Sequence, residues 1–418
     1  MTPTPNPNPR IFLSAGEASG EHYGALLIDA IRAHIPGATF FGLGGQEMEA
    51  AGCERVVKAE DVAHMGITEV IRHMPRIYGE YRKLSASIKK VKPDVAVLID
   101  FPDVNMRLAR KLKALGVPVI YFVGPQLWAW KKWRIRWVRE RVTRMMVIFP
   151  FEEPFYRARG VDAEFVGHPL AELPMPASTR EHYAVQHGLD PARQWIALLP
   201  GSRMKEIKLN LPEMLQAVAL LGSEYEFILP VASTLSHDAV TALLHALHRS
   251  ACDPGNCPHY SLHLVDEARD ALAHARASIV ASGTATVQAA IIGNPFVVVY
   301  RVSNMTYRLA KHLISYPPEI HAQPDEYGNL PVAMVNLIAG SRVVPELLQE
   351  QCNGENIVVK LKPLLADGPA REQMIADLAR VRMALLPPAN AAQQTGTGFH
   401  AIEQVFRAVL RELGHAQD

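Results

Sequence analysis

Short hydrophobic runs alternate with helical stretches along this chain, and the whole alternation occurs twice. The runs are apolar at nearly every position rather than at every second one, which suits parallel strands that are covered on both faces. The sequence therefore predicts an α/β protein with two Rossmann-like, doubly wound domains that face each other across a cleft. The predicted strands are 10–15, 39–44, 94–100, 118–124, 145–150 and 163–168, then 195–201, 226–232, 261–265, 277–282 and 296–301.

The domain boundary is predicted where the alternation breaks. A chain of 418 residues is too long for one ordinary core, and the stretch after Pro169 is rich in proline, as linkers are. We expect domains at 10–172 and 190–385, with a last helix at about 400–413 that packs back on the first domain. Further helices are predicted at 21–34, 67–91 and 103–115.

Composition excludes several broad classes of protein. The formal net charge is +1, so no global field favours nucleic acid as a partner. The first ten residues are polar and proline-rich and do not predict a secretory signal. The uncharged stretch 277–300 contains Gly, Pro, Asn and hydroxyl residues, which suits buried strands and a helix better than a membrane span. A cytoplasmic protein, soluble or peripheral on a membrane, is expected.

Cysteine usage does not predict a disulfide framework, because four cysteines are few for this length. Cys252, Cys257, His259 and His263 loosely resemble a zinc set, but their spacing departs from paired zinc knuckles. We predict no metal and no cofactor.

The loop after the first strand, SAGEASGE at 14–21, joins two glycines and small hydroxyl residues directly to a helix. Such a loop can receive a phosphate or the edge of a sugar, although a plain tight turn would look the same. We expect Glu17, Ser19 and Gly20 to contact a bound sugar, such as the sugar acceptor of a transfer reaction. The loop lacks the glycine spacing of a dinucleotide fingerprint, which disfavours a nicotinamide enzyme.

A second loop, IDFPDVN at 99–105, places polar groups at the end of a predicted buried strand. Asp100 and Asn105 are candidates for contacts to a sugar, and Asp103 could take a proton from a hydroxyl nucleophile. Asp103 could equally be the N-cap of the following helix, a position that Asp favours. The residues alone leave both roles open.

The second half contains two loops that suit a nucleotide diphosphate. LLPGSRMKEI at 198–207 follows a strand, and the guanidinium of Arg203 could neutralise an anionic leaving group. ASGTATVQAAIIGNP at 281–295 starts a helix, whose unpaired N–H groups favour phosphate. The candidate nucleotide-binding residues are Gly201, Ser202, Arg203, Ser282, Gly283, Thr284, Ala285, Thr286 and Gln288.

The stretch WAWKKWRIRWVRERVTR at 128–144 holds four of the five tryptophans together with seven Lys or Arg residues. Tryptophan beside basic residues suits the headgroup layer of a membrane. The same mixture could clamp single-stranded nucleic acid, or form a solvated helix with a few packed rings. The candidate membrane-interface residues are Trp128, Trp130, Lys131, Lys132, Trp133, Arg134 and Trp137.

These loops together resemble the lipid-A-disaccharide synthase family. The motifs that carry the resemblance are AGEASGE (15–21), MGITEV (65–70), IDFPDVN (99–105), GPQLWAW (124–130), FPFE (149–152), VGHP (166–169), LLPGSR (198–203), ASGTAT (281–286), VNLIAG (335–340) and PELLQ (345–349). They occur in the family's order and cover nearly the whole chain. The resemblance implies the GT-B-type architecture of a glycosyltransferase with two Rossmann domains.

The resemblance also implies a reaction and its residues. The family transfers 2,3-diacylglucosamine from its UDP conjugate to 2,3-diacylglucosamine 1-phosphate and releases UDP, with inversion at the anomeric carbon and without a metal. It implies catalytic roles for Asp103, Arg203 and Asn336. Because both substrates carry acyl chains, we expect peripheral attachment to the cytoplasmic face of the inner membrane. No nucleic-acid partner is expected; a homodimer is one possible state, and the sequence does not give the oligomeric state.

Three positions depart from the family's pattern. Glu21 ends the first loop where Asp is usual, and Gln288 replaces an acidic residue expected at the ribose. The segment 316–334 looks longer than the family's connection. The competing predictions are another UDP-sugar enzyme of this architecture, such as UDP-N-acetylglucosamine 2-epimerase or the muramyl-lipid glucosaminyltransferase, and a non-catalytic lipid-binding protein.

Overall fold

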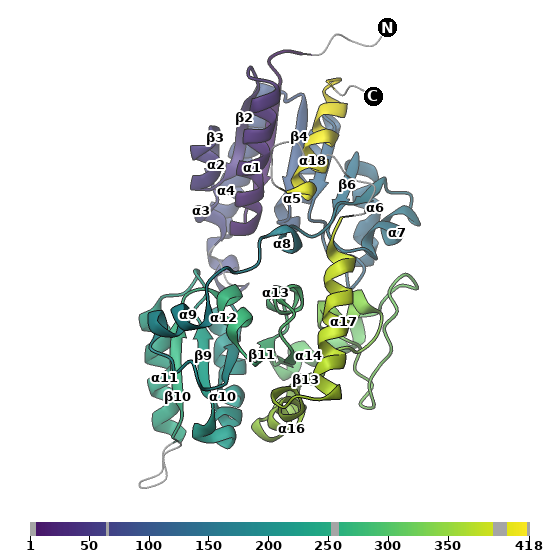
Figure 1. Cartoon of the computed structure of the whole chain (residues 1–418). Coiled ribbons are helices and arrows are strands. Elements are labelled where there is room, and N and C mark those ends of the chain that lie inside the picture. Colours follow the sequence, from purple (N-terminus) through teal and green to yellow (C-terminus); the bar gives the residue numbers. More distant parts are fainter. Residues whose placement is uncertain (1–5, 64–66, 252–258, 388–398, 416–418) are drawn as a thin grey trace. The chain divides into compact units, whose positions relative to one another are not determined.

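The computed structural model describes residues 6–63, 67–251, 259–387 and 399–415 (Figure 1). The chain forms two compact units. The first contains the chain up to Glu172 and again from Leu385 onward, and the second is Leu173–Ala384. Each unit is an α/β sandwich around a parallel sheet, so the predicted fold class is confirmed.

The sheet of the first unit has seven strands in the order β3-β2-β1-β4-β5-β6-β7, and neighbouring strands are parallel. Its centre is almost wholly apolar, as the side chains of β1 and β4 are buried by helices on both faces. The strands are β1 (Arg10–Ala15), β2 (Thr39–Gly44), β3 (Cys53–Lys58), β4 (Val95–Ile99), β5 (Val119–Phe122), β6 (Arg144–Val147) and β7 (Ala163–Phe165).

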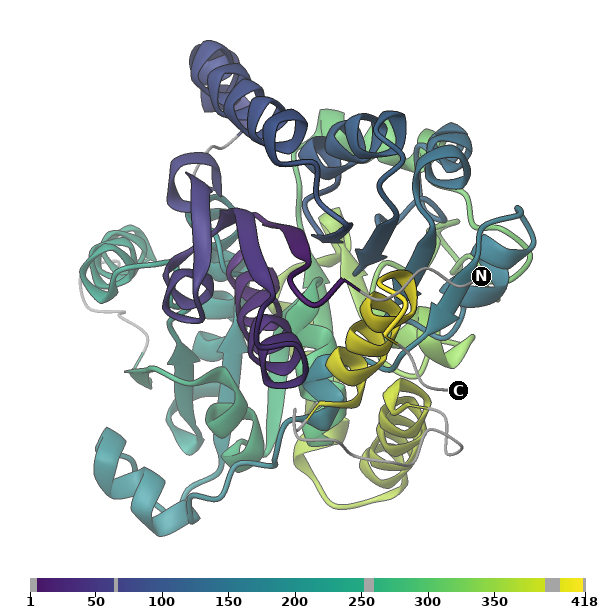
Figure 2. The ribbon, with the colours of Figure 1, turned by 90° about the horizontal axis from the view of Figure 1, so that it is seen from above.

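The last helix of the chain belongs to this first unit. Two views show α18 beside α1 (Figures 1 and 2). The carboxylate of Glu172 accepts the first N–H groups of α18, those of His400 and Ala401, and an anion there is favoured by the helix dipole. The helices of this unit are α1 (Ala18–His34), α2 (Gln46–Ala50), α3 (Glu60–Ala63), α4 (Ile67–Val91), α5 (Pro102–Ala114), α6 (Ile135–Arg141), α7 (Glu152–Arg157), α8 (Pro169–Glu172) and α18 (His400–Glu412), with a 3₁₀ turn at Lys132–Arg134.

The sheet of the second unit has six parallel strands in the order β10-β9-β8-β11-β12-β13. The strands are β8 (Trp195–Leu199), β9 (Glu226–Pro230), β10 (Ser261–Val265), β11 (Ala277–Ala281), β12 (Phe296–Tyr300) and β13 (Glu346–Leu348). The helices are α9 (Arg180–His187), α10 (Met204–Leu221), α11 (His237–Ala251), α12 (Ala268–His274), α13 (Thr284–Ile292), α14 (Asn304–Leu313), α15 (Met334–Ala339), α16 (Gly354–Leu365) and α17 (Pro369–Leu385), with 3₁₀ turns at Gly222–Glu224 and Gln349–Gln351.

Strand order brings the candidate loops together in pairs within each unit. In the first sheet β1 pairs with β4, so the loop 14–21 lies beside the loop 99–105. In the second sheet β8 pairs with β11. The loop with Gly201, Ser202 and Arg203 (the GSR loop) therefore lies beside the loop with Ser282, Gly283 and Thr284 (the SGT loop). Both pairs occupy the point where the strand order reverses, which is where open α/β sheets bind their ligands.

The sequence prediction missed two strands, β3 and β13. β3 is an edge strand with polar residues facing solvent, and β13 has three residues and begins at a glutamate, so neither forms an apolar run. The predicted strands 145–150 and 163–168 end earlier, at Val147 and Phe165. The proline-rich stretch after residue 169 also contains a helix, α9, whose N-cap Thr179 accepts the N–H of His182.

Candidate active site

The loop after β4 is held in place by one buried amide. The Asn105 side chain donates to three backbone carbonyls, those of Asp100 (2.8 Å), Ile99 (3.2 Å) and Ser14 (3.3 Å). Its carbonyl oxygen accepts the hydroxyl of Ser14 at 2.6 Å. This fully buried amide therefore ties the two loops to each other, and its contact with a sugar stays a prediction.

Glu17 and Asp100 lie one in each of these two loops, near enough for the charge of Glu17 to act on Asp100. Gly16 lies so close to the Phe101 ring that a Cβ atom would stand 2.6 Å from it, which excludes any larger residue there. Burial, and secondarily the charge of Glu17, raises the pKa of the Asp100 carboxyl. Ser19 is exposed in the first turn of α1, whereas Gly20 is buried against Ile99.

Asp103 projects from the first turn of α5. Phe101, in a left-handed conformation, is the N-cap of this helix, so the alternative that Asp103 is the cap is wrong. The Asp103 side chain is 74% exposed, and its Oδ1 lies 2.9 Å from Nη1 of Arg134. A carboxylate in the first helical turn is also stabilised as an anion by the helix dipole. The Asp103 carboxylate is therefore accessible to solvent, and its ion pair with Arg134 orients it.

Arg134 joins this carboxylate to the tryptophan-rich stretch. Its guanidinium carbon lies 5.6 Å from the ring centroids of both Trp133 and Trp137, and the two indoles meet edge to face at 4.7 Å. The Arg134 side chain is only 18% exposed. The guanidinium is therefore positioned by two aromatic faces before any ligand binds.

Exposure divides the candidate membrane-interface residues. Trp130 and Trp133 are 48% and 52% exposed, and the ammonium of Lys131 lies 3.9 Å from the Trp130 ring centroid. Trp137 is half-buried. Trp128 is buried, packs edge-on against Phe151, and cannot contact lipid, which corrects that part of the prediction.

The partner that holds Trp128 is Glu152, the glutamate of the FPFE motif, to which the sequence analysis gave no role. The Trp128 indole N–H donates to Glu152 Oε1 at 3.0 Å, and the Phe149 N–H donates to Oε2 at 3.2 Å. Burial raises the pKa of the Glu152 carboxyl to about 7, although these two hydrogen bonds act in the opposite direction. The carboxyl fixes the loop that carries Trp130 and Lys131.

We expect replacement of Glu152 by glutamine to remove a pH-dependent part of stability. A carboxyl whose pKa is about 7 when folded and near 4.5 when unfolded stabilises the fold fully below pH 4.5, and this contribution disappears as the pH rises through 7. The difference in the free energy of unfolding between the wild type and Glu152→Gln should fall by roughly 2–3 kcal/mol between about pH 5 and about pH 8.

Urea unfolding of both proteins at each pH measures this difference. Burial lowers the pKa of His168 to about 4, which gives the opposite slope, but His168 is common to both proteins and cancels. Equal differences at the two pH values would show that Glu152 is ionised in the folded protein.

In the second unit, the GSR loop is shaped by Glu206. The side chain of Glu206 occupies the place of a Cβ at Gly201, whose φ is +129°. Its Oε2 accepts the N–H of Ser202 at 3.2 Å. Arg203 is the N-cap of α10, and its side chain is 72% exposed. Glu206 lies in the quoted motif, but its part in the loop was not predicted.

The SGT loop presents a helix N-terminus. Gly283 is the N-cap of α13, and both Gly283 and Thr284 are exposed. The hydroxyl of Ser282 donates to the carbonyl of Val332 at 3.0 Å. Thr286 is fully buried, and its hydroxyl donates to the Gly283 carbonyl; its contact with a nucleotide stays a prediction. Ala285 and Gln288 are half-buried.

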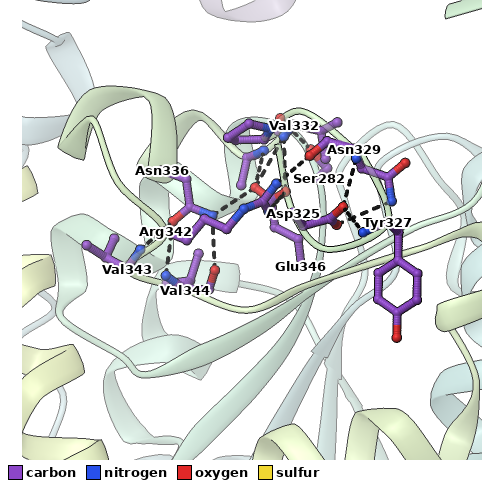
Figure 3. Close-up of polar contacts among 12 residues, drawn as sticks. Ser282, Asp325, Tyr327, Asn329, Val332, Asn336, Arg342, Val343, Val344 and Glu346 are labelled. Carbon is purple, nitrogen blue, oxygen red and sulfur yellow. Dashed lines mark hydrogen bonds and ion pairs between the residues drawn. The ribbon is translucent and has the colours of Figure 1, made fainter. Parts of the chain in front are cut away.

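Asn336 is the centre of a buried network (Figure 3). Its amide donates to Glu346 Oε1 at 2.8 Å and to the Val344 carbonyl at 3.0 Å. Its oxygen accepts the N–H groups of Val343 and Val344. Both N–H donors and both oxygen lone pairs of the Asn336 side chain are thus engaged within the protein. Asn336 thus holds β13 and the chain around it together, and the catalytic role that the resemblance implies for it stays a prediction.

The same network anchors the segment 316–333, which has no helix or strand among its described residues. Glu346 accepts the N–H groups of Val332 and Ala333, and Arg342 donates to both Glu346 and the Asn329 carbonyl. The long connection is therefore tied at its end to β13.

Within the described ranges, there is no cluster of three or more His, Cys, Asp or Glu residues able to hold a metal ion. Of the loosely zinc-like set, Cys252 and Cys257 lie outside the described residues, and His263 bonds to the Ser261 hydroxyl at 2.7 Å. No helix in the described part of the chain is both long and apolar enough to traverse a bilayer.

Solved structures share the fold of this chain. A calicheamicin glycosyltransferase aligns with a TM-score of 0.53 and 16% identity, over 98% of this chain and 100% of that one. UDP-GlcNAc 2-epimerase from Neisseria meningitidis, solved with UDP-GlcNAc, aligns with a TM-score of 0.55 and 10% identity, over 96% and 99% of the two chains. These likenesses establish the GT-B architecture and no more.

Sequence relatives are much closer. The family model described as lipid-A-disaccharide synthetase matches residues 11–393. The lipid-A-disaccharide synthase of Acidobacterium capsulatum is 58% identical over 92% of this chain and 94% of its own length. The lipid-A-disaccharide synthase of Koribacter versatilis is 46% identical over 96% of this chain and 98% of its own length. The one from Myxococcus xanthus is 39% identical over 95% of this chain and 97% of its own length. This chain belongs to the lipid-A-disaccharide synthase family and is a glycosyltransferase.

Proposed function

We propose that the chain transfers 2,3-diacylglucosamine from UDP-2,3-diacylglucosamine to the 6-hydroxyl of 2,3-diacylglucosamine 1-phosphate. The products are the β-1,6-linked disaccharide 1-phosphate and UDP. The observation that carries this proposal is the accessible Asp103 carboxylate, ion-paired with Arg134 at the end of β4, in a chain of this family.

Asp103 is the proposed general base. It takes the proton of the acceptor 6-hydroxyl while that oxygen bonds to the anomeric carbon of the donor. The bond from this carbon to the diphosphate breaks on the opposite face, and its electron pair leaves on the UDP oxygen. Attack opposite to the leaving group inverts the α-linked donor to a β-linked product. Asp100 and Glu17 line the neighbouring loops and are proposed to contact the sugar, with Ser19 and Gly20 beside them.

The second unit is proposed to hold UDP. The guanidinium of Arg203 would neutralise the charge that develops on the diphosphate, with Gly201 and Ser202 beside it. The N-terminus of α13, at Ser282, Gly283 and Thr284, would bind phosphate oxygens through its N–H groups. Ala285 and Gln288, further along α13, are proposed to lie beside the nucleotide. Gln288 can bond to the ribose hydroxyls without charge assistance.

Membrane attachment is proposed through the first unit. Trp130 and Trp133 are exposed beside Lys131, Lys132 and Arg134, a combination that suits the headgroup layer of anionic lipid. Both substrates are acylated sugars, so we propose that the enzyme works at the cytoplasmic face of the inner membrane.

UDP release from UDP-2,3-diacylglucosamine, measured with and without 2,3-diacylglucosamine 1-phosphate in excess EDTA, tests the reaction. We expect release only with the acceptor, and a disaccharide product by mass spectrometry. Release without the acceptor would favour hydrolysis or an epimerase-like reaction. Loss of turnover in EDTA would contradict the proposed metal independence.

We expect Arg203→Ala to lower kcat by about 10²–10³-fold, since removal of one group that stabilises transition-state charge costs this much in other enzymes. Because the Arg203 side chain is exposed, the substitution should change the free energy of unfolding only slightly. The matched control is Arg249→Ala, which removes an exposed arginine from α11. Equal turnover by the two variants would exclude Arg203 from the reaction.

A further inference from the structure

Helix α14 carries an apolar stripe that faces away from the second unit. Met305, Leu309 and Leu313 are 80%, 59% and 56% exposed. Their spacing of four residues places them on one face of the helix. All ten residues of α14 are described, and none of them is buried. Three large apolar side chains in a line on one helix are unlike the singly scattered apolar residues of an ordinary protein surface.

Basic residues border this stripe. Arg308, Lys311 and His312 are exposed on α14, and the Lys311 ammonium also donates to the Tyr327 carbonyl at 3.2 Å. An apolar face flanked by cationic side chains is the pattern of helices that lie in the interface of an anionic membrane.

A groove of about 480 Å³ adjoins the start of α14 and is likewise lined by apolar and basic side chains. It is lined by Met204, Lys205, Lys208 and Leu209 of α10 together with Ser303, the N-cap of α14. Lys205 and Lys208 are exposed. The intervening Glu206 is turned to the GSR loop, where it accepts the Ser202 N–H, so the lysines dominate the charge on this side. Apolar and cationic groups thus continue from α14 to the helix that begins at Arg203.

We propose that α14 and this groove form a second membrane-docking surface, which binds an anionic phospholipid bilayer. This surface lies on the second unit, whereas the tryptophan-rich stretch belongs to the first. The stripe enters the acyl boundary, and Arg308, Lys311, Lys205 and Lys208 meet the headgroup phosphates. The inference rests on the proposed function in one respect, since it assumes that the substrates of the enzyme reside in a membrane.

A bilayer fits this surface better than a second copy of the chain does. A stable protein interface uses roughly 20–30 residues on each partner. Here only three apolar residues on one helix are available, and the exposed charged side chains of α14 itself, Arg308, Lys311 and His312, are all basic. A lipid surface supplies both the apolar layer and the opposite charge.

Vesicle binding by the full chain tests the proposal. The variant Met305→Ser, Leu309→Ser, Leu313→Ser is compared with Val185→Ser, Val359→Ser, Met383→Ser, which removes three equally exposed apolar residues from α9, α16 and α17. We expect the α14 variant to bind phosphatidylglycerol vesicles at least about 10-fold more weakly than the wild type, because several buried methylene groups are lost. The control variant should bind like the wild type.

A charge variant provides a second readout. Lys208→Gln with Arg308→Gln should weaken binding to phosphatidylglycerol vesicles and reduce its dependence on salt, but leave the small binding to phosphatidylcholine vesicles unchanged. Trp130→Ser with Trp133→Ser, in the first unit, should weaken binding independently of the α14 variant.

Two results would overturn the proposal. One is undiminished vesicle binding by the α14 variant. The other is a sedimentation mass below that of the wild type with vesicle binding retained, which would assign the stripe to contact with a second copy. UDP release from substrates in detergent micelles keeps this test separate from the reaction. An α14 variant that turns over in micelles but does not bind vesicles supports docking, whereas absence of turnover in the wild type would concern only the proposed reaction.

Discussion

Asp103→Asn should lower kcat by about 10²–10⁴-fold, the usual contribution of a positioned general base. Asparagine keeps the shape of the side chain and its place in the first turn of α5, but it cannot take the proton of the acceptor hydroxyl. The ion pair with Arg134 becomes a neutral contact, and because the Asp103 side chain is 74% exposed, the cost in stability should stay within about 1 kcal/mol. Steady-state UDP release at saturating substrate, together with a thermal melt, measures both quantities.

Asp29→Asn is the matched control, since Asp29 is an exposed carboxylate on α1 of the same unit. It should keep the kcat of the wild type. If Asp103→Asn instead raises KM and leaves kcat unchanged, Asp103 binds the acceptor and does not accept its proton. A large fall in melting temperature would assign the residue to the framework.

Asn336→Ala should destabilise the second unit by roughly 3–5 kcal/mol, the cost of breaking a buried, charged network by removing one partner. The substitution removes two donors and two accepted hydrogen bonds at once. It leaves the N–H groups of Val343 and Val344 without this partner, and the buried Glu346 carboxylate loses one of its donors. Urea unfolding followed by tryptophan fluorescence and circular dichroism measures the loss.

The control is Asn356→Ala, which removes an exposed amide that donates to the Gln351 carbonyl on the same unit. Its cost should not exceed about 1 kcal/mol. Turnover per folded molecule of Asn336→Ala separates the two interpretations of this residue. An unchanged unfolding curve with lost turnover would restore the catalytic role that the family resemblance implies and contradict a purely structural one.

The sequence predicted those parts of the fold whose signal is local. An apolar run such as 277–281 can only be buried, and the helix 67–91 was predicted with the bounds observed. The edge strand β3 was not predicted because charged residues, two of them exposed, interrupt it, and such a strand has no continuous apolar run. Which loops lie side by side was not predicted, because it depends on the strand order, in which β1 pairs with β4 and β8 with β11.

The candidate site was predictable in its motifs but not in the roles of its members. Asn105 and Asn336 are polar residues near strand ends, as ligand-binding residues often are, yet both amides hydrogen-bond to groups of the protein itself. Trp128 and Trp130 are two positions apart with the same side chain, and only one is exposed. These differences depend on which distant groups surround a side chain. Glu152, for example, meets Trp128 from 24 residues away.

The discontinuity of the first unit has a consequence for biosynthesis. The carboxylate of Glu172 and the α18 N–H groups that it accepts are separated by 228 residues. At a translation rate of about 5–20 residues per second, the ribosome needs on the order of 10–50 s to make the intervening chain. Throughout that interval the surface of α1 that α18 covers has no partner from this helix, although all seven strands of the first sheet have been synthesised. The second unit is therefore complete in sequence before the first can be closed by its last helix.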